Sequence, residues 1–174
     1  KLKSQAKHCV VAYGGELNDT STVLCGNRAF ISQHIGDVEN LETESFLKEA
    51  TGHLQHLTNT HPEVVACDLH PKFNTTRLAK EVSEAQGLPL VQVQHHHAHS
   101  AALMAEHGLD DIAAVACDGY GYGIDGEAWG GEILYCTDDS AEFRRLGHLE
   151  PHLLIGGDLA SRYPIRMAAA MLCK

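Results

Sequence analysis

The sequence predicts an α/β fold in which one order of elements occurs twice. Short apolar runs rich in β-branched residues, bounded by Gly, Asn and Asp, alternate with longer stretches whose apolar residues recur at helical spacing. The order of three strands and then a helix appears near the start of the chain and again about a hundred residues later. The repeat concerns the order of elements rather than residue identity, and it predicts two related lobes.

The first lobe is expected to begin with three strands. Residues 9–14 (CVVAYG), 21–26 (STVLCG) and 28–33 (RAFISQ) are short and rich in strand-forming residues. The Gly26–Asn27 pair favours a tight turn between the second and third of them. We therefore expect a meander.

Alternating helices and strands follow the meander. Asn40 precedes an amphipathic segment, and Gly87 and Gly108 stand where helices are expected to end. The expected elements are, in order, helix 41–57, strand 63–68, helix 74–86, strand 89–94 and helix 95–107. The first lobe, residues 1–110, thus has the predicted order βββαβαβα.

A second lobe, residues 111–174, is expected to repeat this order. Its three strands are expected at residues 112–119, 131–137 and 142–149. Asp158 is placed to cap one helix over 159–173, although Pro164 disfavours its first turns. A complete copy would need a further βαβα, so we expect the second lobe to be truncated in this chain.

The composition excludes several classes of partner. The 174 residues carry a formal net charge of −10, from 23 acidic and 13 basic residues, which argues against a nucleic-acid backbone. No run approaches the roughly 18 apolar residues of a membrane span. The six cysteines form no CxxC pair, and four of them lie in apolar runs. We interpret them as small buried hydrophobes of a cytoplasmic protein.

The stretch 91–100 (VQVQHHHAHS) contains four histidines at an expected strand-to-helix junction. In a helix, His95 and His99 are four residues apart and share a face, so both imidazoles can reach one metal ion. His96 and His97 point elsewhere and are expected to contact a ligand side chain, to pack, or to face solvent. The alternative is that the pair is surface or hydrogen-bonded structure.

Asp118 is the expected third ligand. It ends an apolar strand that opens into a glycine-rich segment, and residues at such strand ends face ligand crevices in α/β folds. Two histidines and a carboxylate suit a divalent metal, iron or zinc, held for Lewis-acid chemistry.

Three glycine-rich segments are candidates for phosphate binding. Residues 119–132 and 13–20 connect expected strands, and residues 155–162 open a helix. If the two hairpins face a shared cleft, their N–H groups can hold a nucleotide's phosphates. No Walker lysine follows either, so neither is a P-loop. The alternatives are a flexible hairpin for 119–132 and a simple helix cap for Asp158, which could otherwise bind a ribose hydroxyl.

Taken together, the motifs resemble the carbamoyltransferases of nickel–iron hydrogenase maturation, the HypF family, in the first part of their C-terminal domain. That domain is related to the tRNA threonylcarbamoyl transferases. The resemblance covers the chain from about residue 9 onwards. It rests on SQHIGDVENLET (32–43), ACDLHPKFNTT (66–76), VQHHHAHSAALMAEHGL (93–109), CDGYGYGIDGEAWGGEIL (117–134) and GGDLASRYPIRMA (156–168).

The resemblance implies an actin-like ATPase (ribonuclease H-like) fold. It also implies that this chain is one domain of a larger protein in which different domains carry out different steps. The remaining domains of the parent chain would form carbamoyl-adenylate from ATP. This domain would pass the carbamoyl group to the C-terminal cysteine thiol of a partner protein, HypE, as the precursor of the cyanide ligands on iron. The implied metal ligands are His95, His99 and Asp118, with a further aspartate elsewhere in the domain. The implied nucleotide-binding residues are Gly119, Gly130, Gly131, Gly156, Gly157 and Asp158.

Two positions depart from the family pattern. A lysine is usual at the position of Asn18, and a glutamate at the position of Tyr163. Two alternatives stay open: an enzyme like the tRNA threonylcarbamoyl transferases, or an inactive fragment that binds metal or nucleotide. We expect a cytoplasmic location and neither nucleic acid nor membrane as partner.

Overall fold

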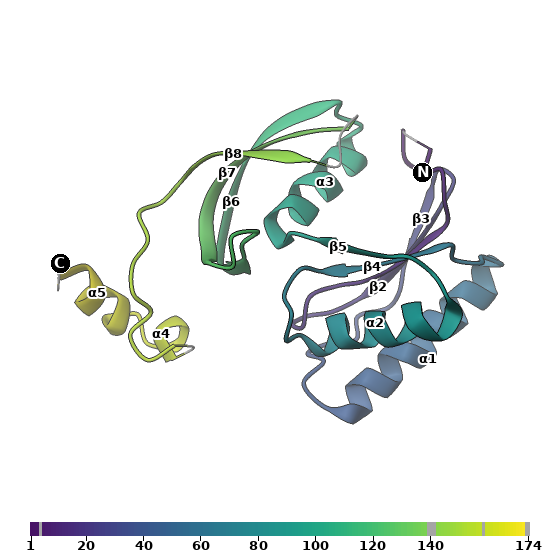
Figure 1. Ribbon diagram of the computed structural model, residues 1–174, viewed down its shortest axis with the longest axis horizontal. Helices are drawn as coiled ribbons and strands as arrows, with labels where there is room; N and C mark the ends of the chain where they lie inside the picture. The colour runs from purple at the N-terminus through teal and green to yellow at the C-terminus, as the bar shows by residue number, and fades with distance from the viewer. Residues whose placement is uncertain (4, 139–141, 158, 173–174) are drawn as a thin grey trace.

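The computed structural model describes residues 1–174 apart from 4, 139–141, 158 and 173–174. It contains two separate sheets (Figure 1). The first has the strand order β3-β2-β1-β4-β5. Its strands are β1 (Val10–Tyr13), β2 (Ser21–Cys25), β3 (Arg28–Ile31), β4 (Val64–Asp68) and β5 (Leu90–Val93). Strands β1 to β3 form the expected antiparallel meander, and β4 and β5 extend it in parallel.

Two helices cover one face of this sheet, α1 (Leu41–Thr58) and α2 (Asn74–Gln86) (Figure 1). The Asn40 side chain caps α1 by accepting the N–H groups of Glu42 and Thr43, and Gly87 ends α2 in the left-handed conformation. The core between sheet and helices contains the fully buried side chains of Val11, Val23, Leu47, Val65 and Leu78. Alternate residues of β1 and β4 point into it, as the period of two along a strand requires.

The second sheet is an antiparallel meander of β6 (Asp111–Tyr122), β7 (Ala128–Thr137) and β8 (Phe143–His148). Helix α3 (His95–His107) follows β5 directly and packs against β6 and β7 (Figure 1). This helix therefore carries the chain from one sheet to the other. The order of elements through β8 agrees with the sequence prediction, whereas the lobe boundary at residue 110 stays a prediction.

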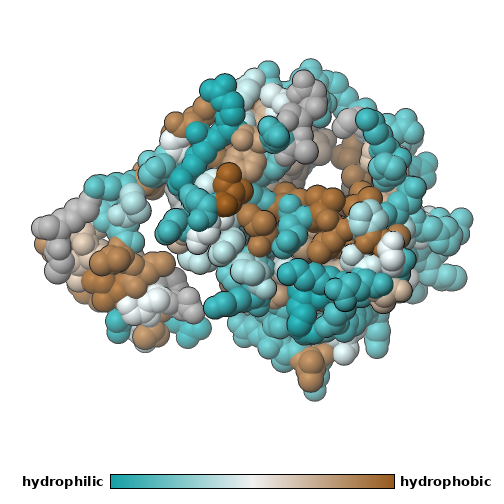
Figure 2. Space-filling view, viewed as in Figure 1, coloured by the Kyte–Doolittle hydropathy of each residue, from teal (hydrophilic) through white to brown (hydrophobic). Residues whose placement is uncertain are grey.

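The last described segment holds two short helices, α4 (Leu159–Arg162) and α5 (Ile165–Leu172). The prediction of one continuous helix was wrong. Pro164 has no backbone N–H to donate, and it lies in the turn that separates α4 from α5. The predicted cap, Asp158, lies outside the described residues. An extended stretch after β8 separates these helices from both sheets (Figure 1). Apolar side chains gather on the surface of the helices that faces the viewer (Figure 2).

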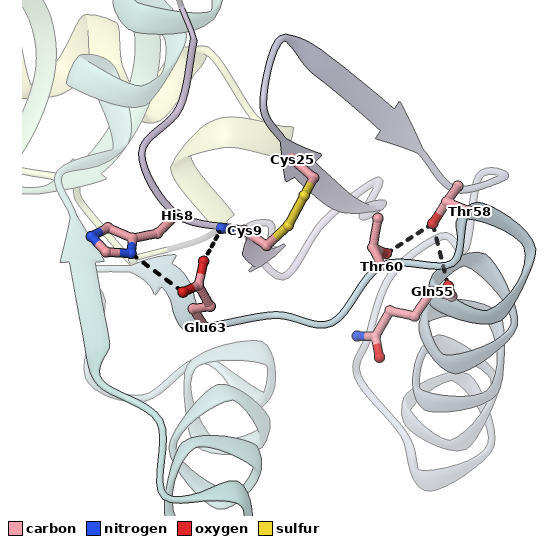
Figure 3. Close-up of a disulfide and its surroundings, with 7 residues drawn as sticks. All are labelled: His8, Cys9, Cys25, Gln55, Thr58, Thr60 and Glu63. Atoms are coloured by element: carbon pink, nitrogen blue, oxygen red, sulfur yellow. Dashed lines mark hydrogen bonds and ion pairs between the residues drawn. A yellow bond between two sulfur atoms is a disulfide. The ribbon is translucent and has the colours of Figure 1, made fainter.

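Cys9 and Cys25 form a disulfide between the start of β1 and the end of β2 (Figure 3). The interpretation of the cysteines as unpaired side chains was wrong for this pair, because the β1–β2 register sets the two residues opposite one another. Cys67 and Cys136 are free and buried as expected, and Cys117 is free but exposed. Among the described residues, no helix combines the length and apolar composition that crossing a bilayer requires.

Candidate metal centre

The histidine cluster lies where β5 passes into α3. The side-chain oxygen of Gln94 accepts the His97 N–H at 2.9 Å and caps the helix. One turn of helix then places His95 and His99 on the same face, with 3.2 Å between their Nε2 atoms. The helix start thus fixes where both imidazoles lie.

Asp118 reaches the same point from β6. Its Oδ2 lies 3.1 Å from Nε2 of His95 and 3.6 Å from Nε2 of His99. One ligand atom from each of the three residues lies within 4.8 Å of the others. The structure therefore brings together the three side chains chosen from the sequence, and their binding of a metal stays a prediction.

Asp68 was missed by the sequence analysis. It ends β4, is 7% exposed, and its Oδ2 lies 2.7 Å from Nδ1 of His95. Its other oxygen accepts the backbone N–H of His70 at 2.7 Å. The sequence held a signal, since Asp68 ends an apolar run just as Asp118 does, but no local pattern connected Asp68 to the histidines.

The contact with Asp68 affects both the tautomer and the pKa of the His95 imidazole. With its proton on Nδ1, His95 donates to this carboxylate, and Nε2 is then the nitrogen that can bind a metal beside His99 and Asp118. The hydrogen bond to Asp68 raises the pKa of His95, burial opposes it, and the charges of Asp68 and Asp118 add to the increase. The arrangement matches the carboxylate–histidine pairs that orient metal ligands in proteins.

The two inner histidines are packed. His96 is fully buried, and burial lowers its pKa. The ring of His97 lies 4.8 Å from that of Phe143, and burial lowers its pKa as well. Neither belongs to the converging group of His95, His99 and Asp118.

The glycine-rich segment 119–132 is mostly strand. Strand β6 runs to Tyr122 and β7 begins at Ala128, so only a short turn is left between them. The expectation of a long loop was wrong, because here glycine serves close packing. A Cβ on Gly130 would lie 2.7 Å from the carbonyl oxygen of Gly119, and one on Gly131 would lie 2.5 Å from Cδ1 of Leu149.

Both hairpins reach the histidines. A Cβ on Gly15, between β1 and β2, would lie 3.4 Å from Cε1 of His95. A Cβ on Gly121 would lie 3.4 Å from Cβ of the same residue. The first hairpin and the β6–β7 hairpin therefore both border His95, as a shared site requires.

The other predicted nucleotide residues lie apart from this group. Gly156 and Gly157 form a turn with positive φ before α4, at the end of the extended stretch (Figure 1). Asp158 is outside the described residues. A nucleotide-binding role for these three and for Gly119, Gly130 and Gly131 stays a prediction.

Comparisons with known proteins point to one family. Residues 5–106 match the family model described as the HypF Kae1-like domain, and residues 114–174 match that of the second subdomain of the carbamoyltransferase Kae1-like domain. The chain is 51% identical to carbamoyltransferase HypF2 of Cupriavidus necator, over 94% of this chain and 20% of that protein. It is 41% identical to a probable carbamoyltransferase HypF of Methanocaldococcus jannaschii, over 95% of this chain and 22% of that protein.

A solved structure gives the same answer. The crystal structure of full-length HypF in the phosphate- and nucleotide-bound form matches with a TM-score of 0.87 and 40% identity, over 97% of this chain and 26% of that one. The chain therefore spans only about a fifth to a quarter of the length of these relatives.

Proposed function

Because the chain belongs to the family of the HypF Kae1-like domain, we propose that it is the metal-binding part of a carbamoyltransferase that acts in hydrogenase maturation. The observation that carries the proposal is the convergence of His95, His99 and Asp118 on one point. His95 and His99 come from helix α3 and Asp118 comes from strand β6, so only the folded chain assembles them.

The side chains suit a divalent metal, iron or zinc. They offer two imidazole nitrogens and one carboxylate oxygen, and Asp68 holds the proton of His95 on the nitrogen that faces away from the other two. When bound, such a metal supplies Lewis-acid polarisation of a ligand oxygen. Asp118 supplies the negative charge that offsets part of the metal's charge.

The substrate we propose is carbamoyl-adenylate, formed from ATP by the remaining domains of the family protein. Support comes from the two hairpins that border His95 and from a relative whose crystal structure is a phosphate- and nucleotide-bound form. The proposed nucleotide-binding residues are Gly119, Gly130, Gly131, Gly156, Gly157 and Asp158.

The acceptor we propose is the C-terminal cysteine thiol of HypE, in the synthesis of the cyanide ligands. Two of the chain's own thiols are poor nucleophiles, because burial raises the pKa of Cys67 and of Cys136 and keeps them protonated. A nucleophile from a partner protein is consistent with this. Cytoplasmic location is part of the proposal, and the Cys9–Cys25 disulfide stands against it, since structural disulfides are rare in that compartment.

The alternative acceptor is a tRNA adenosine. The net charge of −10 disfavours it, because a tRNA backbone needs clustered Lys and Arg. A gel shift with tRNA separates the two: binding at physiological salt would favour the tRNA enzyme, and none is expected.

Transfer of a labelled carbamoyl group tests the proposal. The chain is supplied with the remaining family domains, the acceptor protein, ATP and a labelled carbamoyl donor. We expect the double variant His95→Ala/His99→Ala to lose transfer to the acceptor thiol while adenylate formation elsewhere continues. Transfer that persists in the double variant rules out a required metal at this point, and transfer by the 174-residue chain alone rules out the inactive-fragment alternative.

A further inference from the structure

His96 is a buried histidine that the proposed metal centre does not use. Its side chain is fully buried in α3, beneath β6. A Cβ on Gly121 would lie 2.7 Å from its Cε1 and 2.9 Å from its Nε2, so glycine at that position leaves the ring its space. The imidazole is therefore held in one place by the packing of helix against strand.

Gln94 determines which nitrogen of His96 carries the proton. The Gln94 oxygen is already occupied, since it accepts the His97 N–H at 2.9 Å. Its amide nitrogen lies 3.3 Å from the carbonyl oxygen of Tyr122 and 3.4 Å from Nδ1 of His96. An amide N–H₂ only donates, so Nδ1 must accept and the proton of the neutral ring must be on Nε2.

The Nε2–H group of His96 has no hydrogen-bond partner among the described residues, although it is buried. A buried donor without an acceptor is rare in native proteins and calls for an explanation. The carboxylate that faces it is Asp118, with Oδ2 at 3.9 Å, just beyond hydrogen-bond distance. The same oxygen is 3.1 Å from Nε2 of His95.

We propose that His96 is a positioning residue for Asp118: its Nε2–H donates to the Asp118 carboxylate and holds that side chain toward the metal. The proposal rests on the metal centre proposed above. Asp118 has two oxygens, so it can accept from His96 and bind a metal at once. Asp68 orients His95 in the same manner, so two of the three ligand side chains each have a buried partner.

The tautomer of His96 is the first test, and it needs no variant. Nitrogen-15 NMR of the histidine rings is recorded on the 174-residue chain before and after addition of Zn²⁺. We expect the His96 proton on Nε2 in both samples, with slower exchange after zinc is added. A proton on Nδ1 overturns the proposal, and so does loss of the Nε2 proton on zinc addition, which would make His96 a ligand.

Cobalt titration of variants is the second test. Co²⁺ is added to the metal-free chain, and its visible absorption reports binding and coordination. His96→Met keeps the volume and removes the donor, and we expect it to weaken Co²⁺ binding about 10- to 100-fold. His96→Gln places an amide nitrogen near the position of Nε2 and should recover most of the affinity. His97→Gln is the matched control, because His97 packs against Phe143 and the variant should leave the affinity unchanged.

The outcomes separate the two proposals. His96→Met binding Co²⁺ as tightly as the unmodified chain overturns the role of His96, provided that Asp118→Ala abolishes binding. Unchanged binding in His95→Ala, or none in the unmodified chain, overturns the metal centre itself and the role of His96 with it. If His96→Met fails to fold, the NMR measurement on the unmodified chain decides.

Discussion

The Asp68 carboxylate lies 2.7 Å from Nδ1 of His95, while Nε2 of the same ring lies 3.1 Å from Asp118. One imidazole thus joins the end of β4 to the middle of β6. The buried carboxylate decides the tautomer, and the tautomer decides which nitrogen is available to a metal.

This relationship predicts the effect of Asp68→Asn. The amide can rotate its N–H₂ toward Nδ1, which favours the wrong tautomer of His95, and it no longer offers a negative charge. We expect Co²⁺ affinity to fall about 10-fold or more, with little change in fold. Asp111→Asn, an exposed carboxylate at the start of β6, is the control and should bind as before. Equal affinity in both variants would show that Asp68 does not orient His95.

Gly121 and Gly119 give a second prediction, because they lie on the same strand in different surroundings. A Cβ at Gly121 meets Cε1 of His96 at 2.7 Å, whereas a Cβ at Gly119 meets nothing within 4 Å. We expect Gly121→Ala to destabilise the fold by about 1–3 kcal/mol through overpacking. Gly119→Ala should change stability by less than about 0.5 kcal/mol.

Thermal unfolding of the two variants measures the difference. The melting temperature of Gly121→Ala should fall by several degrees and that of Gly119→Ala should stay near that of the unmodified chain. A similar melting temperature for both would mean that His96 can shift freely. That result would also weaken the argument that packing holds its ring in place.

The sequence predicted α3 from residue 95 to 107 as the structure has it, because its limits are local. Gly108 ends α3 in the left-handed conformation. At the other end, strand β5 runs to Val93, so the helix cannot begin much before His95. The same local spacing fixed His95 and His99 on one face. Asp118 was chosen because it was predicted to end a strand, a rule that needs the fold class and no coordinates. That placement was wrong, because β6 continues to Tyr122 and Asp118 lies where its register with β7 shifts.

Features that depend on contacts between distant segments were missed. Asp68 and His95 are 27 residues apart, and Cys9 and Cys25 meet only because β1 and β2 pair in one register. The glycines of 119–132 were read as a loop, since composition alone does not distinguish a flexible turn from two strands that approach closely at Gly119 and Gly130.

Glu44 provides a third prediction, on stability. It is buried in α1 and binds Arg77 of α2, with Lys48 Nζ 2.7 Å from its other oxygen. Burial alone would raise its pKa, but hydrogen bonds from Lys48 and Arg77 outweigh burial and lower it. Because the pKa of Glu44 is lower in the folded state, its contribution to stability is present at pH values above the ordinary pKa of a glutamate. That contribution is lost as the pH falls through the lowered pKa of the folded state.

Glu44→Gln should therefore destabilise the fold by about 1–3 kcal/mol at pH 7, since it leaves two cations facing an amide. Urea unfolding measures the change. Glu81→Gln is the matched control: Glu81 binds the same guanidinium at 2.6 Å but is half exposed, so its loss should cost less than about 0.5 kcal/mol. Equal losses in the two variants would contradict the importance of burial at Glu44.

Asp19 gives the last prediction, a dependence of stability on pH. Its carboxyl is 2% exposed, at the end of the first hairpin, and neither oxygen makes a well-formed hydrogen bond with the part of the chain that the structure describes. Burial raises its pKa to about 7, against weaker opposing contacts with the N–H groups of Thr20 and Gly14. Because the folded state holds the proton more tightly than the unfolded state, this group's contribution to stability is fully present below pH 4 or so. It is lost as the pH rises toward about 7.

Asp19→Asn removes the titrating proton and keeps the shape. We expect the variant to be more stable than the unmodified chain at pH 8, by an amount on the order of 4 kcal/mol at most, and to differ little at pH 4. Urea unfolding at a series of pH values measures the slope. Asp37→Asn, at an exposed carboxylate that accepts the Asn18 N–H, should keep the slope of the unmodified chain. A slope that survives in Asp19→Asn would mean that another buried group, and not Asp19, carries the loss of stability between pH 4 and pH 8.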